Sequence, residues 1–293
     1  MAAVARAAAA VGLAVVVVAT VARAQSPGTP LRIVSTSPSI TETLFALGLG
    51  DRVVGVSQYC RFPPEVLKLP KVGSFLHPDP ERIVALRPDL VVVHRTAGDL
   101  AGRLSTMHVR AVEVDEGTMA SVFDAVRQIA VAAGVPARGE ALVADIQRRL
   151  DGVARSAAAG PRPSVLFIIG RRPGTLADLV AVGPHAYLDA LIGIAGGRNV
   201  LETEGLPEYP RISMETVLRL DPDIIVDTVD MGDTKAERLA RQTINQRLWA
   251  AYPGLRAVQS NRVYADTADA LVVPGPRIID AAEWVAAHIR PRR

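Results

Sequence analysis

Residues 81–93 read ERIVALRPDLVVV, and residues 215–227 read ETVLRLDPDIIVD. The two passages share a glutamate, a Leu-x-Pro-Asp turn and an apolar run, each offset by 134 positions (215 minus 81). Each copy predicts a short helix, a turn and a β-branched strand buried on both faces, as in a parallel sheet. The Leu-x-Pro-Asp part alone also fits an ordinary helix-turn-strand of any α/β protein. The paired glutamates favour a repeat, so the chain is predicted to contain two related lobes.

The first 24 residues have the pattern of a secretory signal peptide. Arg6 gives a basic start, residues 7–18 are a run rich in alanine and valine, and Ala22-Arg23-Ala24 resembles a cleavage site. A membrane anchor is the alternative, but the apolar run is shorter than the roughly 20 residues that span a bilayer. No cysteine follows the predicted cut, which argues against a lipid anchor. We therefore expect a mature protein that begins at Gln25 and is soluble in the periplasm of a Gram-negative cell.

Composition excludes several classes of function. Loss of the signal peptide lowers the formal net charge from +3 to +1, and the remaining basic residues are scattered, so no nucleic-acid footprint is present. About 269 residues (293 minus 24), within a chain that is 49% hydrophobic, suffice for two domains with cores of their own. Cys60 is the single cysteine, so no internal disulfide can form.

The predicted organisation is two α/β lobes with mainly parallel central sheets, joined by one long rigid α-helix. The N-terminal lobe is expected over residues 25–135, the linking helix over 136–160 and the C-terminal lobe over 161–293. The linking segment places Leu142, Ile146, Leu150 and Val153 on one face, which predicts a helix of about 33 Å. Because such a linker is stiff, the lobes are expected to move little. The other expected strands are 31–35, 53–56, 109–114, 165–169 and 262–265, and the other expected helices are 40–49, 119–133, 186–195, 237–250 and 276–288.

Seven short motifs carry a resemblance to a known family: SPSITE at 37–42, GVSQY at 55–59, FPP at 62–64, ERIVALRPD at 81–89, AGGRNV at 195–200, ISME at 212–215 and PRI at 276–278. Together they resemble the periplasmic substrate-binding proteins of ABC importers for cobalamin, ferric siderophores and haem. The resemblance runs from about residue 31 to residue 290. It implies a ligand held between two lobes and a monomeric receptor that delivers it to a permease dimer with a cytoplasmic ATPase. It also implies that Glu81 and Glu215 dock onto permease arginines, a charge-assisted contact that would fix orientation.

The chain is most similar to the cobalamin-binding branch, because GVSQY ahead of FPP matches the place of a stacking tyrosine. The resemblance implies that Tyr59 lies against a corrin ring, which needs apolar and aromatic faces. For Phe62 and Tyr187 the alternative interpretation is that they belong to the hydrophobic core. The ligand-binding residues predicted from the resemblance and the residue types are Tyr59, Phe62, Phe75, Tyr209, Arg211, Asp269, Leu271, Val272, Val273 and Arg277.

The sequence differs at two places from the family branches named above, and both differences bear on which ligand is bound. The loop at 269–273 has no aromatic residue, unlike that of the cobalamin branch, and Ser74 follows Gly73 where the haem branch has a tyrosine. A ferric siderophore is the alternative ligand, because Arg171, Arg172, Arg211 and Arg277 supply positive charge for an anionic chelate. Arg171 and Arg172 are more simply explained as solvated side chains.

Metal and catalytic motifs are missing from the sequence. No two histidines have ligand spacing on one helix face, and one cysteine gives no zinc-type cluster; direct ligation by His77, His185 or Cys60 is the minor alternative. No Gly-x-Ser-x-Gly elbow or phosphate loop occurs. We therefore expect a protein that is not an enzyme and has no cofactor of its own, with a two-domain periplasmic metalloenzyme as a remote alternative. The five histidines are His77, His94, His108, His185 and His288.

Overall fold

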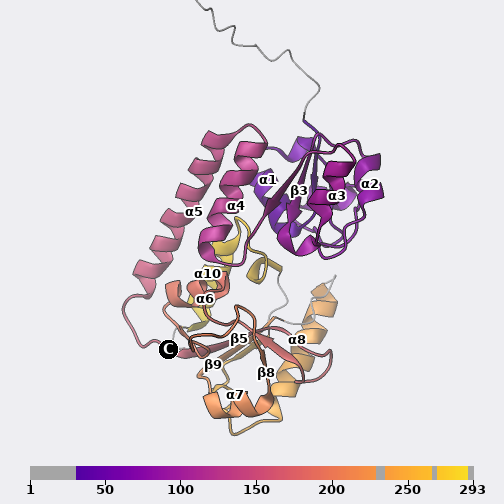
Figure 1. Cartoon of the computed structure of the whole chain (residues 1–293). Coiled ribbons are helices and arrows are strands. Elements are labelled where there is room, and N and C mark those ends of the chain that lie inside the picture. Colours follow the sequence, from indigo (N-terminus) through magenta and orange to yellow (C-terminus); the bar gives the residue numbers. More distant parts are fainter. Residues whose placement is uncertain (1–30, 229–234, 266–268, 290–293) are drawn as a thin grey trace, which may run out of the picture. The chain divides into compact units, whose positions relative to one another are not determined.

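The structure, a computed structural model, describes residues 31–228, 235–265 and 269–289 (Figure 1). The predicted signal peptide lies outside the described residues. The first lobe contains a parallel sheet in the order β2-β1-β3-β4. Its strands are β1 (Ile33–Ser35), β2 (Val53–Val56), β3 (Leu90–His94) and β4 (Ala111–Val114). Its helices are α1 (Pro38–Ala46), α2 (Pro80–Ala85), α3 (Leu100–Thr106) and α4 (Met119–Ala132).

Helices cover both faces of this first sheet. Ile33 and Val92 belong to a buried cluster with side chains of α1 and α4, whereas Val34 and Val91 belong to a cluster with side chains of α2 and α3. Successive strand residues point to opposite faces, so a strand buried on both sides must be apolar throughout. This explains the uninterrupted run of apolar residues in β3.

The linking helix α5 (Pro136–Ala157) contains 22 residues and packs against α4 of the first lobe and against α6 and α10 of the second. The sequence predicted its position, and Pro136 at its first turn agrees with the missing N–H of proline, which a helix start does not need. Ile146 and Leu150 of α5, together with Val122 of α4, belong to the main buried cluster of the second lobe. The first lobe and the linker therefore help to build the second core.

The second lobe has a mixed sheet in the order β10-β9-β5-β6-β8, with β7 paired to β5. The strands β6 and β8 run antiparallel to their neighbours and, like α3 and β7, were not predicted. The strands are β5 (Ser164–Gly170), β6 (Leu179–Ala181), β7 (Arg198–Asn199), β8 (Arg211–Ile212), β9 (Ile224–Asp227) and β10 (Val263–Ala265). The helices are α6 (Tyr187–Ile194), α7 (Met214–Leu220), α8 (Lys235–Ala250), α9 (Arg256–Gln259) and α10 (Ile278–Ile289).

The repeated Pro-Asp turn has the same geometry in both lobes. Arg87 and Asp221, at equivalent positions, both have left-handed backbone conformations, with φ of 48° and 42°. Asp89 then accepts the backbone N–H of Arg32 at 2.7 Å, and Asp223 accepts that of Ser164 at 2.8 Å. Each carboxylate thus binds the chain where the first strand of its own lobe starts.

The predicted start of α1 was wrong by two residues. The sequence reading placed the start at Ile40, but the helix begins at Pro38 because the Ser37 hydroxyl accepts the N–H of Ile40 at 3.3 Å. This cap directs the first turn of α1 to the carboxyl edge of the first sheet.

Candidate functional site

Polar side chains gather where the strands of the first sheet end. Ser37 and Ser39 follow β1, His94 ends β3, and Asp115 and Glu116 follow β4. The carboxyl ends of parallel strands meet at one edge of a sheet, which is where open α/β folds bind ligands. Sequence reasoning did not select His94, Asp115 or Glu116 as site residues.

Glu116 is the most perturbed carboxyl group at this edge. The Ser39 hydroxyl donates a hydrogen bond to Glu116 Oε2, and His94 Nε2 lies 3.6 Å from the same oxygen. Burial raises the pKa of Glu116 to about 8, opposed by the Ser39 hydrogen bond and reinforced by the charges of Asp115 and Glu42. Burial also lowers the pKa of His94. Near neutral pH both groups are therefore mainly uncharged.

Arg277 connects the second lobe to this edge of the first. Its Nε donates to Glu42 Oε2 at 2.8 Å, and its Nη2 donates to Oε1 of the same carboxylate. The guanidinium carbon also lies 4.2 Å from the centroid of the Phe62 ring, a cation–π contact. Glu42 is only 4% exposed, so this bidentate pair is largely desolvated. Sequence reasoning selected Arg277 and Phe62 but missed Glu42, whose partner is 235 positions away.

A second contact between the lobes involves the loop after β4. The backbone N–H of Tyr187 donates to the carbonyl of Gly117 at 2.8 Å. A Cβ added at Gly117 would lie 2.6 Å from the Glu208 carboxylate, so glycine permits this close approach. Burial, with the charges of Glu208 and Asp115, raises the pKa of Tyr209 well above its usual value. These observations place Glu208 and Tyr209 of the second lobe beside Asp115.

The predicted aromatic residues divide into exposed and buried ones. Tyr59 is 44% exposed and Phe62 is 43% exposed, and Phe75 meets Tyr59 edge-on with ring centroids 5.9 Å apart. Tyr209 is half-buried against the core of the second lobe, and Tyr187 is 4% exposed within it. Tyr187 is thus a core residue, whereas Phe62 is not.

The other predicted ligand-binding and docking residues differ in their burial. Leu271 and Val273 are buried, Val272 is half-buried and packs against the same core, and Arg211 is exposed on β8. The backbone at Asp269 belongs to a short 3₁₀ turn (Asp269–Leu271), but its side chain lies outside the described residues. Glu81 and Glu215 are both exposed in the first turns of α2 and α7.

Arg171 contradicts its interpretation as a solvated side chain. Its Nε lies 3.2 Å from Asp227 Oδ2, both side chains are fully buried, and its Nη2 donates to Asn245. The Nε1–H of Trp249 donates to the same Asp227 oxygen at 2.8 Å. This network of hydrogen bonds and an ion pair, which joins β9 to α8, explains why the charge of Arg171 can be buried. No local sequence pattern predicts it. Arg172 is exposed and pairs with Asp178 at 2.7 Å.

Cys60 is 1% exposed and close to the Thr41 hydroxyl, at 3.1 Å. Burial raises the pKa of its thiol to about 11.

Within residues 31–228, 235–265 and 269–289, no three His, Cys, Asp or Glu side chains are arranged to hold a metal ion. Among the helices in this part of the chain, none combines the length and apolar character needed to cross a membrane.

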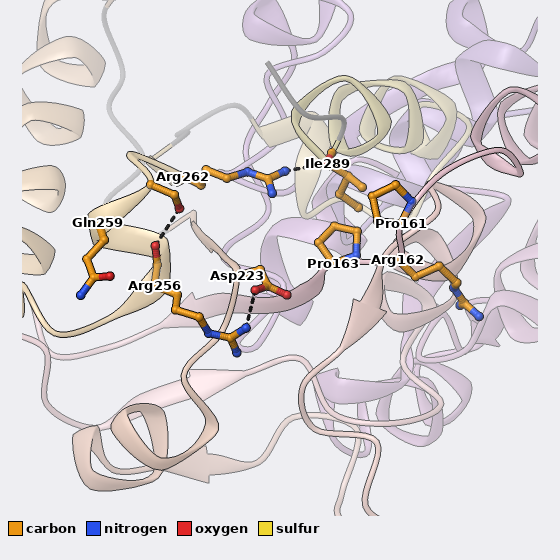
Figure 2. Close-up of a pocket in the computed structure, with 9 residues that line it drawn as sticks. Pro161, Arg162, Pro163, Asp223, Arg256, Gln259, Arg262 and Ile289 are labelled. Carbon is orange, nitrogen blue, oxygen red and sulfur yellow. Dashed lines mark hydrogen bonds and ion pairs between the residues drawn. The ribbon is translucent and has the colours of Figure 1, made fainter. Parts of the chain in front are cut away.

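Two of the cavities lined by described residues lie away from this edge of the sheet, and no predicted ligand residue lines either of these two. The larger, of about 610 Å³, lies by Pro163, Asp223 and Arg262, just before β5, β9 and β10 (Figure 2). Its arginines are engaged: Arg256 pairs with Asp223 at 2.7 Å, and Arg262 donates to the carbonyl of Ile289. The smaller, of about 450 Å³, lies between α8 and Leu176.

Known proteins resemble this chain over nearly its whole length. The vitamin B12-binding protein of Vibrio cholerae is 27% identical over 263 residues, covering 88% of this chain and 89% of that protein. An uncharacterized ABC transporter substrate-binding lipoprotein of Bacillus subtilis, YvrC, is 27% identical and covers 89% of this chain and 81% of that protein. The apo structure of the periplasmic haem-binding protein RhuT from Roseiflexus sp. RS-1 has a TM-score of 0.75 at 27% identity, covering 89% of this chain and 98% of that one.

The family model described as periplasmic binding protein matches residues 33–270, which include both sheets and the linking helix. The two lobes joined by α5 agree with the fold of these relatives. The chain therefore belongs to the periplasmic binding protein family.

Proposed function

We propose that this protein is the solute-binding component of an ABC importer, and that it captures a corrinoid between its two lobes. The observation that carries the proposal is that Tyr59 and Phe62 both expose their rings just after β2, whose carboxyl end lies at this edge of the first sheet. Arg277 of the second lobe lies on the Phe62 ring. An aromatic face beside a few polar groups suits a flat, amide-bearing macrocycle. The vitamin B12-binding relatives support the same ligand class.

The proposed role is capture and delivery, without a covalent step. The two lobes contact each other through Glu42 with Arg277 and through Gly117 with Tyr187. The ligand would enter beside these contacts. Exposed Glu81 and Glu215 would then dock onto arginines of the permease in the inner membrane, and hydrolysis of ATP by the partner ATPase would drive release.

A ferric chelate is the second candidate ligand, because the haem-binding RhuT is as similar in sequence as the vitamin B12-binding protein. Calorimetric titration of the purified protein with cyanocobalamin, cobinamide, hemin and a panel of ferric siderophores separates these ligands. Saturable one-to-one binding of a corrinoid supports the proposal. Binding of a ferric chelate alone would overturn the corrinoid assignment and keep the transport role.

Tyr59→Ala tests the aromatic face. Loss of one stacking ring should weaken corrinoid binding by about tenfold, or roughly 1.4 kcal/mol. Leu218→Ala is the matched control, because Leu218 is 47% exposed on α7, a helix with no predicted ligand residue. Equal effects of the two variants would contradict the placement of the ligand.

Reversal of the docking charges tests the transport role separately. Glu81→Arg and Glu215→Arg should retain ligand affinity and abolish uptake in cells that depend on this importer. Glu140→Arg is the control, because Glu140 is exposed on the linking helix. Loss of ligand binding in either docking variant would show that these glutamates belong to the ligand site instead.

A further inference from the structure

The exposed rings that are proposed to meet the ligand stand on a loop that leaves β2 and returns beside it. The loop comprises residues 57–70 and carries both Tyr59 and Phe62. Directly after the loop, Lys71 forms a parallel β-bridge with Val56, the last residue of β2. The backbone of Lys71 is therefore fixed to the first sheet, and its side chain starts from a well-defined position.

The side chain of Lys71 joins the two arms of this loop. Its Nζ donates to the carbonyl of Val66 at 3.0 Å and to the carbonyl of Cys60 at 3.4 Å. Phe62 lies between these two residues in the sequence, and Tyr59 directly precedes the first of them. Burial lowers the pKa of Lys71, as expected for an ammonium that is partly withdrawn from water into such contacts. One side chain thus connects the parts of the loop on both sides of Phe62.

Two further contacts fix the arm of the loop that carries Tyr59. Cys60 is buried, and its Sγ lies 3.1 Å from the hydroxyl of Thr41 on α1. The backbone N–H of Gln58 donates to the carbonyl of Gly73 at 2.8 Å. Both neighbours of Tyr59 are therefore held by the protein, although the ring of Tyr59 itself is exposed.

We propose that Lys71 is a positioning residue for the ligand: its ammonium holds the 57–70 loop so that the rings of Tyr59 and Phe62 are in place before the ligand arrives. This inference rests on the proposed function, since it concerns the same aromatic rings. A loop that becomes ordered only on binding loses backbone freedom at that step, and this loss weakens the affinity. Lys71 removes that cost, because the loop is already ordered in the free protein.

The variant Lys71→Met tests this role, because methionine fills similar space and cannot donate to the two carbonyls. At a temperature where both proteins are fully folded, the variant should bind cyanocobalamin about tenfold more weakly than the wild type, as measured by calorimetry. Lys68→Met is the matched control, because Lys68 is exposed on the same loop and should leave the affinity unchanged. Unchanged affinity in Lys71→Met, or equal losses in both variants, would overturn the proposal.

A double-mutant cycle separates positioning from a general loss of stability. Tyr59→Ala should weaken binding about tenfold in the wild type but less than threefold in Lys71→Met, because a ring that is no longer held contributes less to binding. If Lys71 had only a structural role, Tyr59→Ala would have the same effect in both backgrounds. That result would overturn the proposal.

Hydrogen exchange of the wild-type protein tests the proposal even if Lys71→Met does not fold. The amides of Gln58 and Cys60 donate to backbone carbonyls, and both should be protected from exchange in the free protein. Saturating ligand should then change their exchange rates less than threefold. Amides that exchange freely until the ligand binds would show that the loop is not positioned in advance.

Failure of the proposed function gives a different result. If hemin binds and neither cyanocobalamin nor cobinamide does, the corrinoid assignment is wrong, and the same variants are titrated with hemin. Weaker binding by Lys71→Met but not by Lys68→Met would uphold the positioning role for another ligand. Equal affinities of both variants for hemin would overturn it.

Discussion

Replacement of Glu116 by glutamine should change how the stability of the protein depends on pH. In the folded protein, burial keeps this carboxyl group neutral up to a pKa of about 8, whereas its ordinary pKa is 4.5. At about 1.4 kcal/mol per pH unit, this difference corresponds to at most about 5 kcal/mol. Because the pKa is raised in the folded protein, the stabilising contribution of Glu116 to the free energy of unfolding is fully present below pH 4.5 and is lost as the pH rises towards 8.

The glutamine variant keeps the size of the side chain and cannot ionise. Between pH 5 and pH 8 the wild-type protein should therefore lose about 3 kcal/mol of unfolding free energy relative to Glu116→Gln. The groups that face Glu116, namely Ser39, Glu42, His94 and Asp115, are the same in both proteins, so the difference between the two pH profiles reports on Glu116 itself. The variant should be the more stable protein at pH 8.

The assay is guanidinium unfolding, followed by circular dichroism at pH 5, 6, 7 and 8. Glu113→Gln is the matched control, because Glu113 is exposed on the same strand, β4, and should show no such trend. Parallel pH profiles for wild type and Glu116→Gln would refute the reasoning. They would mean that water reaches the carboxylate and keeps its pKa near the ordinary value.

Three further outcomes follow from polar contacts and from the burial of Cys60. Asp223→Ala should lower the free energy of unfolding by about 2 kcal/mol, because Asp223 accepts hydrogen bonds from both the N–H and the hydroxyl of Ser164. Asp89→Ala should lower it by about 1 kcal/mol, because among the described residues Asp89 accepts only the N–H of Arg32. Urea unfolding measures both changes. Trp249→Phe should cost about 2 kcal/mol in the same assay, since it removes a donor to the buried carboxylate of Asp227, and a neutral effect would contradict that hydrogen bond. Cys60 should react with a thiol reagent only on the timescale of unfolding, because it is buried and its pKa is about 11; immediate labelling of the native protein would disprove this.

The sequence predicted features that depend on local patterns. The repeat identified both Pro-Asp turns, and the apolar face of residues 136–160 identified α5 to within three residues at each end. The antiparallel strand β8 was missed because it has only two residues, Arg211–Ile212, too few to show an alternating pattern. Two residues contain no periodicity to detect.

Much of the candidate site could not be predicted, for a different reason. The pair of Glu42 and Arg277 joins residues 235 positions apart, and the contact of Ser39 with Glu116 joins residues 77 positions apart. Burial decides the pKa of Glu116, and burial comes from the packing of whole lobes. The same holds for Arg171, whose side chain became a core group only because Asp227 and Asn245 lie beside it.

The main buried cluster of the second lobe includes side chains from α4 and α5, and this affects what happens when the lobe is expressed without them. Val122, Ile146 and Leu150 precede the second lobe in sequence but are 1%, 1% and 4% exposed within its main cluster. A fragment starting at residue 161 would leave the surfaces that cover these side chains open to water, and each lost contact of this size destabilises by roughly 1.5–3 kcal/mol. The halves of the repeat are thus not separable modules: the second should be insoluble when expressed alone, and the intact chain should unfold in one cooperative transition.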